Sequence, residues 1–213
     1  MQKNESHLIL FLGDSLTEGY RLAPGLAFPE RIGERLVAAG VSTRVINAGV
    51  AGHTTADALR RLPLLLKPPP SQARSKTGDT ITDLVIELGV NDLLQRIPLA
   101  TVRANLAGIV QIARAACPRI RIFLFLVPPL GLRFDFSENP AGELRETEAD
   151  EYTRDFGALF PEVAAKENLI LLPFLLEGVM LRPGYNQPDL IHPNPRGQAI
   201  VVENVWRSLK YYF

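Results

Sequence analysis

Two kinds of hydrophobic segment alternate along the chain. Short continuous apolar runs are typical of strands buried on both faces, whereas apolar residues spaced three or four positions apart are typical of helices with one buried face. Leu8–Leu12 is such a continuous run, and we predict five strands, at Leu8–Leu12, Thr43–Ile46, Leu84–Leu88, Ile120–Val127 and Leu169–Leu172. Strand and helix segments follow one another about five times, which predicts a three-layer α/β/α domain with a mainly parallel sheet.

The segments between these strands divide into helices and loops. Helices are predicted from Pro29 to Gly40, over Thr55–Leu66, over Thr101–Ala116, through a charged stretch beginning near Glu143, and from Pro195 to Lys210. Two of them contain a proline, Pro63 and Pro161, and each proline is predicted to kink or interrupt its helix because it lacks a backbone N–H. The stretches Lys67–Thr80 and Pro128–Glu143 are predicted to be loops.

Composition narrows the class of protein. A chain of 213 residues is long enough to bury a sizeable core, and we predict that residues 1–213 form a single domain. The 23 Lys and Arg residues balance 23 Asp and Glu residues, and this zero net charge argues against a protein that binds nucleic acid or an anionic membrane. The single cysteine, Cys117, excludes an internal disulfide and a cysteine-based zinc site, and we predict no metal.

The longest purely apolar run, Leu8–Leu12, is too short to span a bilayer. It also lacks the small-residue cleavage site of a signal peptide. We therefore expect a cytoplasmic protein without stable membrane association, unless a leader has been removed from the chain. The aromatic C-terminus is compatible with either a monomer or a homo-oligomer.

Polar residues gather where the predicted strands end. Gly13-Asp14-Ser15 follows the first strand, residues 47–54 follow the second, and Gly89-Val90-Asn91-Asp92 follows the third. A fourth cluster, Asp189-Leu-Ile-His192, precedes the last helix. Because ligands of open α/β sheets bind beyond the carboxyl ends of the strands, we expect all four clusters to meet on one rim.

Ser15, Asp189 and His192 are the candidate catalytic residues of this rim. A serine at the start of a helical turn is most simply an N-cap, and Asp189 could equally cap the last helix beside a surface histidine. Together, however, a nucleophile, a base that titrates near neutral pH and a carboxylate that orients the base fit the logic of a catalytic triad. The Gly-x-Ser-x-Gly motif of the α/β-hydrolases is absent.

Acyl transfer also needs donors for an oxyanion. Gly52 offers a backbone N–H without a side chain in the way, and Asn91 offers a side-chain amide at the same rim. Each residue is also common in ordinary turns. The presence of a nucleophile, base, orienting carboxylate and donors at strand ends favours the catalytic interpretation.

These residues resemble the four sequence blocks of the GDSL/SGNH hydrolase family. The similarity extends to its bacterial esterase branch with thioesterase, lysophospholipase L1 and arylesterase activities, and it covers the chain from Leu8 to the final helix. The resemblance implies a flavodoxin-like SGNH hydrolase fold and no cofactor. It makes Ser15 the nucleophile, His192 the general base and Asp189 its orienting carboxylate. The same resemblance assigns the oxyanion hole to the N–H groups of Ser15 and Gly52 and the side chain of Asn91.

Other residues are candidate substrate contacts, namely Asp14, His53, Val90, Phe134, Phe136 and Ile191. His53 stands where the branch commonly has an aspartate; it could bring positive charge to the rim or be a solvated loop residue. The apolar residues within Pro128–Leu144 could line an acyl groove, form a lid, or fold back on the core.

The leading hypothesis is thus a serine esterase that acts on small-molecule carboxylic esters, with thioesters and lysophospholipids as further substrates. A carbohydrate O-acetylesterase would use the same residues and differ in the shape of its groove. A non-catalytic flavodoxin-like binding module is the third hypothesis, and the absence of a glycine-rich phosphate loop argues against it.

Overall fold

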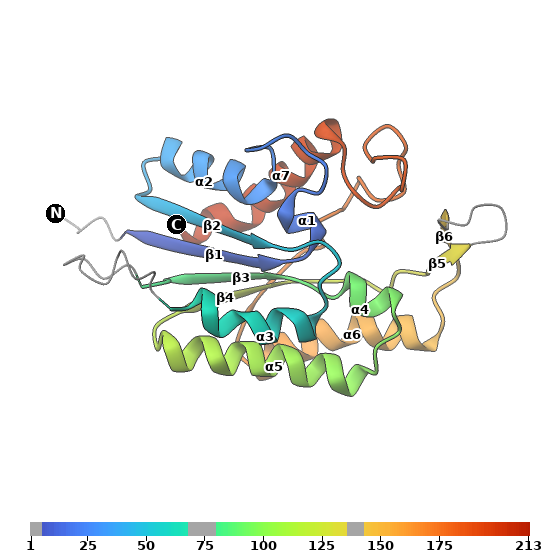
Figure 1. Cartoon of the computed structure of the whole chain (residues 1–213), viewed down its shortest axis with the longest axis horizontal. Coiled ribbons are helices and arrows are strands. Elements are labelled where there is room, and N and C mark those ends of the chain that lie inside the picture. Colours follow the sequence, from blue (N-terminus) through green and yellow to red (C-terminus); the bar gives the residue numbers. More distant parts are fainter. Residues whose placement is uncertain (1–5, 68–79, 136–142) are drawn as a thin grey trace.

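A five-stranded sheet forms the centre of the protein (Figure 1). The computed structural model describes residues 6–67, 80–135 and 143–213. All strand pairs of this sheet are parallel, and the strand order is β2-β1-β3-β4-β7. The strands are β1 (His7–Gly13), β2 (Thr43–Gly49), β3 (Asp83–Glu87), β4 (Arg121–Phe125) and β7 (Ile170–Leu172). The predicted α/β fold with a mainly parallel sheet is confirmed.

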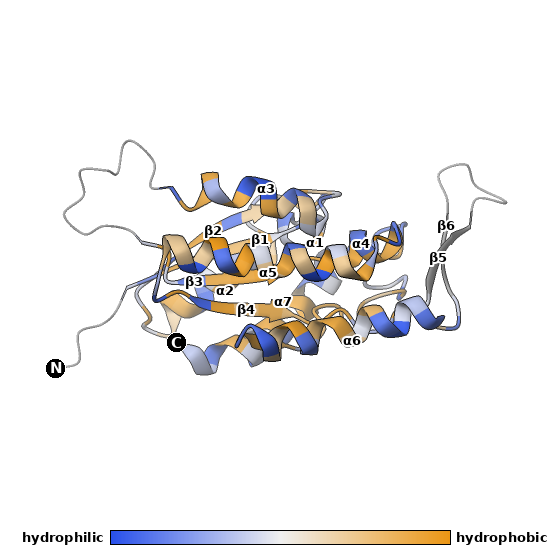
Figure 2. Ribbon diagram, turned by 90° about the horizontal axis from the view of Figure 1, so that it is seen from below, coloured by the Kyte–Doolittle hydropathy of each residue, from blue (hydrophilic) through white to orange (hydrophobic). Residues whose placement is uncertain are grey.

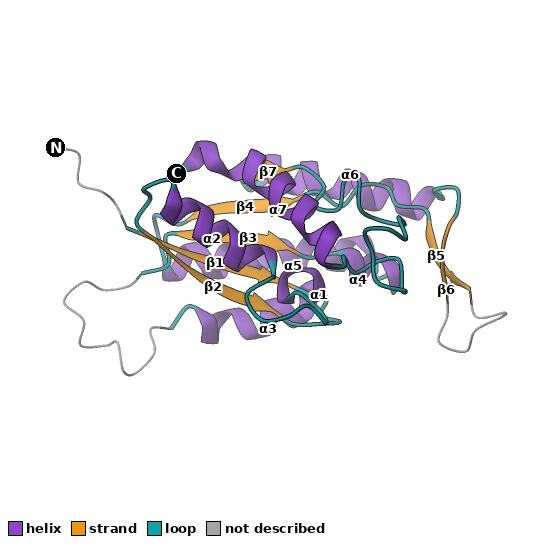
Figure 3. Ribbon diagram, turned by 90° about the horizontal axis from the view of Figure 1, so that it is seen from above, coloured by secondary structure: helices purple, strands orange, loops and turns teal. Residues whose placement is uncertain are grey.

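Helices cover both faces of the sheet (Figures 1 and 3). Helices α2 (Phe28–Ala38) and α7 (Pro195–Leu209) pack on one face, and α7 runs on into a 3-10 turn at Lys210–Tyr212. Helices α3 (Thr55–Leu65), α5 (Leu99–Ala116) and α6 (Glu151–Lys166) pack on the other. Two short helices, α1 (Ser15–Glu18) and α4 (Val90–Leu94), follow the carboxyl ends of β1 and β3.

The central strands β1, β3 and β4 are mostly apolar because both of their faces are buried (Figure 2). In β1, Ile9 and Phe11 pack with α2 and α7, whereas Leu10 and Leu12 pack with α3 and α5. This two-residue alternation is the pleat of a β-strand. It explains why a continuous apolar run, and not an alternating one, marks a central strand such as β1, whereas the edge strand β2 alternates in exposure.

Neither internal proline ends its helix, so the predicted interruption at Pro161 is wrong. Helix α3 continues past Pro63, and α6 runs without a break from Glu151 to Lys166. Both prolines are exposed, and each follows a fully buried residue, Leu62 or Phe160. Burial of each large apolar side chain contributes about 1.5–3 kcal/mol. Several such residues on one helix therefore offset the cost of about 3 kcal/mol for an interior proline.

The segment after β4 also differs from the prediction. Within the predicted loop and the start of the charged helix, β5 (Leu132–Asp135) pairs with β6 (Glu143–Glu146) as an antiparallel hairpin. Helix α6 begins only at Glu151, where the Asp150 side chain accepts a hydrogen bond from the Thr153 N–H at 2.9 Å. Most of the predicted Lys67–Thr80 loop lies outside the described residues.

The strand order creates a switch point between β1 and β3. From β1 the chain moves to β2 on one side of the sheet and then to β3 on the other. The loops that leave β1 and β3 consequently run in opposite directions and leave a crevice at the carboxyl ends of the strands, which is where open α/β sheets bind ligands. Among the described helices, none combines the length and apolar character needed to cross a membrane.

Candidate active site

Ser15 begins α1 directly after β1. The preceding residue, Asp14, caps this helix, and its Oδ1 accepts a hydrogen bond from the Leu16 N–H at 2.9 Å. The chain turns so tightly that a Cβ on residue 13 would lie 1.9 Å from the Oγ1 of Thr17. Only glycine therefore fits at Gly13. The turn places the half-buried Ser15 at the N-terminus of α1, above the end of the sheet.

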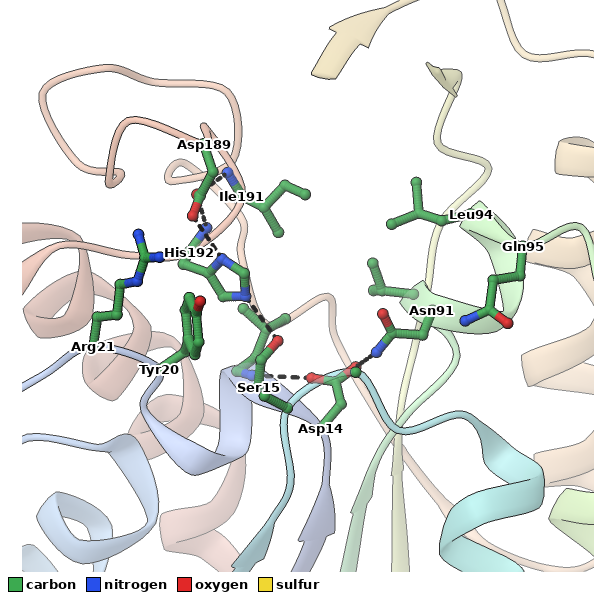
Figure 4. A pocket seen from close by; sticks show the side chains of 14 residues that line it. Asp14, Ser15, Tyr20, Arg21, Asn91, Leu94, Gln95, Asp189, Ile191 and His192 are labelled. Atoms are coloured by element: carbon green, nitrogen blue, oxygen red, sulfur yellow. Dashed lines mark hydrogen bonds and ion pairs between the residues drawn. The ribbon is translucent and has the colours of Figure 1, made fainter. Parts of the chain in front are cut away.

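His192 and Asp189 reach Ser15 from the loop before α7 (Figure 4). The His192 Nε2 lies 2.8 Å from the Ser15 Oγ, and its Nδ1 lies 2.9 Å from the Asp189 Oδ2. The other oxygen of Asp189 accepts the N–H groups of Ile191 at 3.0 Å and His192 at 2.9 Å. The aspartate therefore fixes both the histidine ring and the loop that carries it.

The charge of Asp189 is maintained by these contacts. Partial burial alone would raise the pKa of the Asp189 carboxyl. Hydrogen bonds from the backbone and ring of His192 and from the Ile191 N–H outweigh burial and hold the pKa below its usual value. The carboxylate is thus ionised at neutral pH and can stabilise a protonated imidazole.

Gly52 and Asn91 lie on two further loops of the same rim. Gly52 follows β2 with a φ of +78°, a left-handed conformation that favours glycine. Asn91 lies in the first turn of α4, and its Nδ2 donates to the Asp14 Oδ2 at 3.1 Å and to the His53 carbonyl at 3.0 Å. The structure thus brings all the residues of the expected triad and oxyanion hole to one place.

A pocket of about 690 Å³ opens above Ser15. Polar groups of the predicted site form its floor and one side, and apolar side chains from α1, α4 and the loop before α7 form much of the remaining wall. The lining residues are Asp14, Ser15, Leu16, Tyr20, Arg21, Ala51, Gly52, Val90, Asn91, Leu94, Gln95, Asp189, Ile191 and His192. A pocket of this size and character suits a small molecule with an apolar part.

Three of the six expected substrate contacts line this pocket. Asp14, Val90 and Ile191 line it. His53 is not among the described lining residues; it is half-buried, and its backbone carbonyl supports Asn91. Phe134 belongs to β5, and Phe136 lies outside the described residues, so their role in an acyl groove or lid stays a prediction.

Tyr20 and Arg21 were missed in the sequence. The Tyr20 ring packs against the ring of His192 with 4.6 Å between centroids, and the Arg21 guanidinium lies 4.9 Å from the centre of the Tyr20 ring. Arg21 has a φ of +56°, which is uncommon for any residue except glycine, asparagine and aspartate. The sequence signal that could have identified both residues as part of the site is their position shortly after Ser15, just past the end of the same short helix.

Three carboxyl groups lie buried beneath the pocket, on Asp14, Glu87 and Asp92. Burial raises the pKa of Asp14 to about 7, and burial together with the adjacent Asp14 raises the pKa of Glu87 well above its usual range. Burial also raises the pKa of Asp92, although Thr55 donates its N–H and its hydroxyl to that carboxyl at 2.9 and 2.6 Å. Glu87 was also missed in the sequence, and the signal was an acid inside an otherwise apolar strand.

Within the described parts of the chain, no group of three or more histidine, cysteine, aspartate or glutamate side chains is arranged to hold a metal ion. A hydrogen-bonded serine, histidine and aspartate at the end of a parallel α/β sheet is the arrangement of serine hydrolases.

Comparison with known proteins agrees with this class. The model of the GDSL-like lipase/acylhydrolase family matches residues 11–200. The chain is 32% identical over 209 residues to esterase TesA of Pseudomonas aeruginosa. That alignment covers 98% of this chain and 90% of the esterase. It is 31% identical over 202 residues to thioesterase 1/protease 1/lysophospholipase L1 of Escherichia coli K12, covering 95% of this chain and 83% of that protein.

A solved structure shows the same fold. The crystal structure of AlinE4, an SGNH-hydrolase family esterase, superposes with a TM-score of 0.68 at 33% identity, covering 98% of this chain and 97% of that one. The chain belongs to the GDSL-like lipase/acylhydrolase family. The prediction of a GDSL-type carboxylic ester hydrolase is confirmed at the level of the family.

Proposed function

We propose that this chain is a serine esterase that hydrolyses carboxylic esters of small molecules through an acyl-enzyme on Ser15. The observation that carries the proposal is the hydrogen-bonded series from the Ser15 Oγ through His192 to Asp189, with separations of 2.8 and 2.9 Å, on the floor of a pocket with an apolar wall. Activity as an esterase or thioesterase in the relatives named above is consistent with it.

In the acylation step the Ser15 Oγ attacks the ester carbonyl carbon while its proton passes to the Nε2 of His192. The Asp189 carboxylate stabilises the resulting imidazolium through Nδ1 and is not itself protonated. The carbonyl oxygen becomes an oxyanion, for which the proposed donors are the N–H groups of Ser15 and Gly52 and the amide of Asn91. Collapse of the intermediate breaks the bond to the leaving group, which receives the proton from His192.

In the deacylation step a water molecule takes the place of the leaving group. His192 removes a proton from this water, the resulting hydroxide attacks the acyl carbon, and a second oxyanion forms at the same donors. When that intermediate collapses, the Ser15 Oγ recovers its proton from His192 and the carboxylic acid departs. The cycle needs a single base because His192 is regenerated in each half.

The pocket wall favours an acyl chain over an acetyl group. Leu16, Val90, Leu94 and Ile191 give the space above Ser15 an apolar side that an acetyl group would leave largely unfilled. Thioesters and lysophospholipids are included among the proposed substrates because their acyl chains present the same apolar group to this wall. The rival hypothesis is a carbohydrate O-acetylesterase, which would have to bind a polar sugar against this apolar wall.

The test is hydrolysis of p-nitrophenyl esters from acetate to palmitate, with Ser15→Ala as the matched control and circular dichroism to show that the variant is folded. Activity that peaks at medium or long chains and disappears in Ser15→Ala supports the proposal. Activity confined to acetate that also disappears in Ser15→Ala would favour the O-acetylesterase.

A fluorophosphonate probe tests the nucleophile independently of the substrate. The proposal requires covalent labelling of the native chain and none of Ser15→Ala. An unlabelled native chain without esterase activity would favour the binding-module hypothesis, and activity that survives in Ser15→Ala would contradict the assignment of Ser15.

A further inference from the structure

Asn91 has no unused N–H with which to bind an oxyanion. Its amide nitrogen carries two hydrogens, and the two acceptors within reach are the His53 carbonyl at 3.0 Å and the Asp14 Oδ2 at 3.1 Å. These acceptors fix the orientation of the amide, because its oxygen would be repelled by both. An oxyanion must therefore share or take over one of these two hydrogen bonds.

Asp14 is the acceptor that lies beside the nucleophile. It is the residue directly before Ser15 and lines the pocket, whereas His53 is not among the described lining residues. Its carboxyl is only 1% exposed, and it accepts the Leu16 N–H through one oxygen and the Asn91 amide through the other. The two N–H donors favour the anionic form of Asp14, while burial opposes it.

Glu87 is the second member of this buried group. Its side chain, 4% exposed, forms a hydrogen bond with the Asp14 carboxyl, and its Oε2 accepts the Thr17 hydroxyl at 2.8 Å. Two carboxyl groups in contact inside a protein do not both ionise at neutral pH, so the pair retains at least one proton. Both oxygens of Asp14 accept N–H groups, which can only donate. Glu87 accepts the Asp14 N–H and the Thr17 hydroxyl, and a hydroxyl can accept as well as donate, so the proton belongs on Glu87.

Neighbouring charges also affect the pair, and the nearby Asp92 carboxyl disfavours a second negative charge on it. The charged or titratable groups on the elements around the pair include Asp92 of α4, Arg61 of α3, Glu18 of α1 and His192 of the loop before α7. Asp92 is bound by Thr55, and Glu18 accepts the Ala51 N–H. The Arg61 guanidinium donates to the Gly13 carbonyl at 2.8 Å.

We propose that Asp14 is the positioning residue for the oxyanion donor Asn91, and that Glu87 supports it by supplying the proton that the two buried carboxyl groups share. The N–H of Asn91 that Asp14 holds in the free enzyme is the one that turns toward the oxyanion. The shared proton limits the charge of the Asp14–Glu87 pair to at most one unit. This inference rests on the proposed role of Asn91.

A double-mutant cycle tests whether Asp14 acts through Asn91. Asn91→Ala should lower kcat by about 10²–10³-fold, the usual effect of deleting one oxyanion donor. Asp14→Asn should lower kcat by about tenfold with little change in KM, because it weakens the placement of a donor without removing it. Asparagine is chosen because it can still cap α1 through the Leu16 N–H. In the double variant Asp14→Asn should cost nothing beyond the effect of Asn91→Ala.

Glu87→Gln tests the shared proton. Glutamine mimics a protonated glutamate, since its amide N–H can donate to Asp14 and its oxygen can accept from Thr17. Glu87→Gln should therefore lose much less kcat than Asp14→Asn, and it serves as the conservative variant. Each kcat is calculated from the concentration of active sites, measured as the amount of Ser15 that the fluorophosphonate labels when the labelling reaction is complete. Misfolded protein is thereby excluded from the comparison.

Four results would overturn the inference. Additive losses in the cycle would show that Asp14 acts by a route other than Asn91, and native kcat in Asp14→Asn would show that it positions nothing. A loss in Glu87→Gln as large as in Asp14→Asn would show that Glu87 works as an anion. Loss of labelling in Ser15→Ala together with full activity of Asn91→Ala would remove the oxyanion assignment while leaving the Ser15 nucleophile in place.

Discussion

Asp189→Asn changes one atom of the site and should reverse the role of His192. In the native chain one oxygen of Asp189 accepts the N–H groups of Ile191 and His192 at 3.0 and 2.9 Å, and the other accepts from the His192 Nδ1 at 2.9 Å. In the variant the amide oxygen must stay on the two backbone donors, because an NH2 group there would face two N–H groups. The NH2 group of the introduced amide is therefore forced toward the histidine ring.

The forced orientation determines the tautomer of His192. An NH2 group donates, so Nδ1 must become an acceptor and the ring proton moves to Nε2, which faces the Ser15 Oγ. A protonated Nε2 cannot accept the serine proton. The same substitution in a Ser–His–Asp protease lowers kcat about 10⁴-fold, and we expect a loss of that order here, or about 5.4 kcal/mol at about 1.36 kcal/mol per tenfold change.

The assay is steady-state hydrolysis of the best p-nitrophenyl ester by the native chain, Asp189→Asn and Asp189→Ala. KM should change little in Asp189→Asn, because the pocket wall is untouched. Asp189→Ala imposes no orientation on the ring and should retain more kcat than Asp189→Asn. If folded Asp189→Asn kept a large part of the native kcat, the aspartate would not be setting the tautomer and this reasoning would be refuted.

Three further predictions concern charge, packing and pH. Arg21 forms no ion pair within the described residues and lies on the pocket, so Arg21→Gln should raise KM for an anionic coenzyme A thioester more than for a neutral p-nitrophenyl ester, as measured by paired kinetics. Phe160 is fully buried, and Phe160→Ala should cost about 3–5 kcal/mol in urea unfolding, while Leu64→Ala at an exposed position of α3 should cost far less. The pKa of Asp14 is raised from 3.8 to about 7, so between these values the folded chain holds a proton that the unfolded chain has lost. The free energy of unfolding should therefore fall as the pH rises through this window, and Asp14→Asn should be more stabilising near about pH 8 than near about pH 4. An equal effect of Asp14→Asn at both pH values would contradict the last prediction.

The sheet was predictable from the sequence because its strands are buried on both faces. Continuous runs such as Leu8–Leu12 and Leu84–Ile86 differ from the spaced apolar residues of a half-exposed helix, and their alternation with helical segments indicates the class of fold. The hairpin β5–β6 was not predictable in the same way. It is a separate two-stranded sheet in which no such run marks the strands.

The two helix prolines show where local rules lose to packing. Proline in a helix interior is unfavourable in every sequence, but whether the helix ends depends on what its neighbours bury. Phe156 and Phe160 are fully buried on α6, and Pro161 faces solvent beside them. The sequence shows the proline, whereas the face on which it lies becomes clear only when the helix is packed.

The same limit applies to the site. Ser15, Asn91 and His192 could be proposed from sequence because each lies in a short polar cluster at the end of an element. Glu87 stands out only as an acid in an apolar run, and its pairing with Asp14 comes from the register of two strands far apart in sequence. Parallel pairing places Gly13 opposite Glu87, and the next residue of the first strand's turn is Asp14. A shift of one residue in this register would send the Glu87 side chain to the other face of the sheet and separate the two acids. The packing that fixes the register of β1 against β3 therefore also fixes the acid pair beneath the proposed nucleophile.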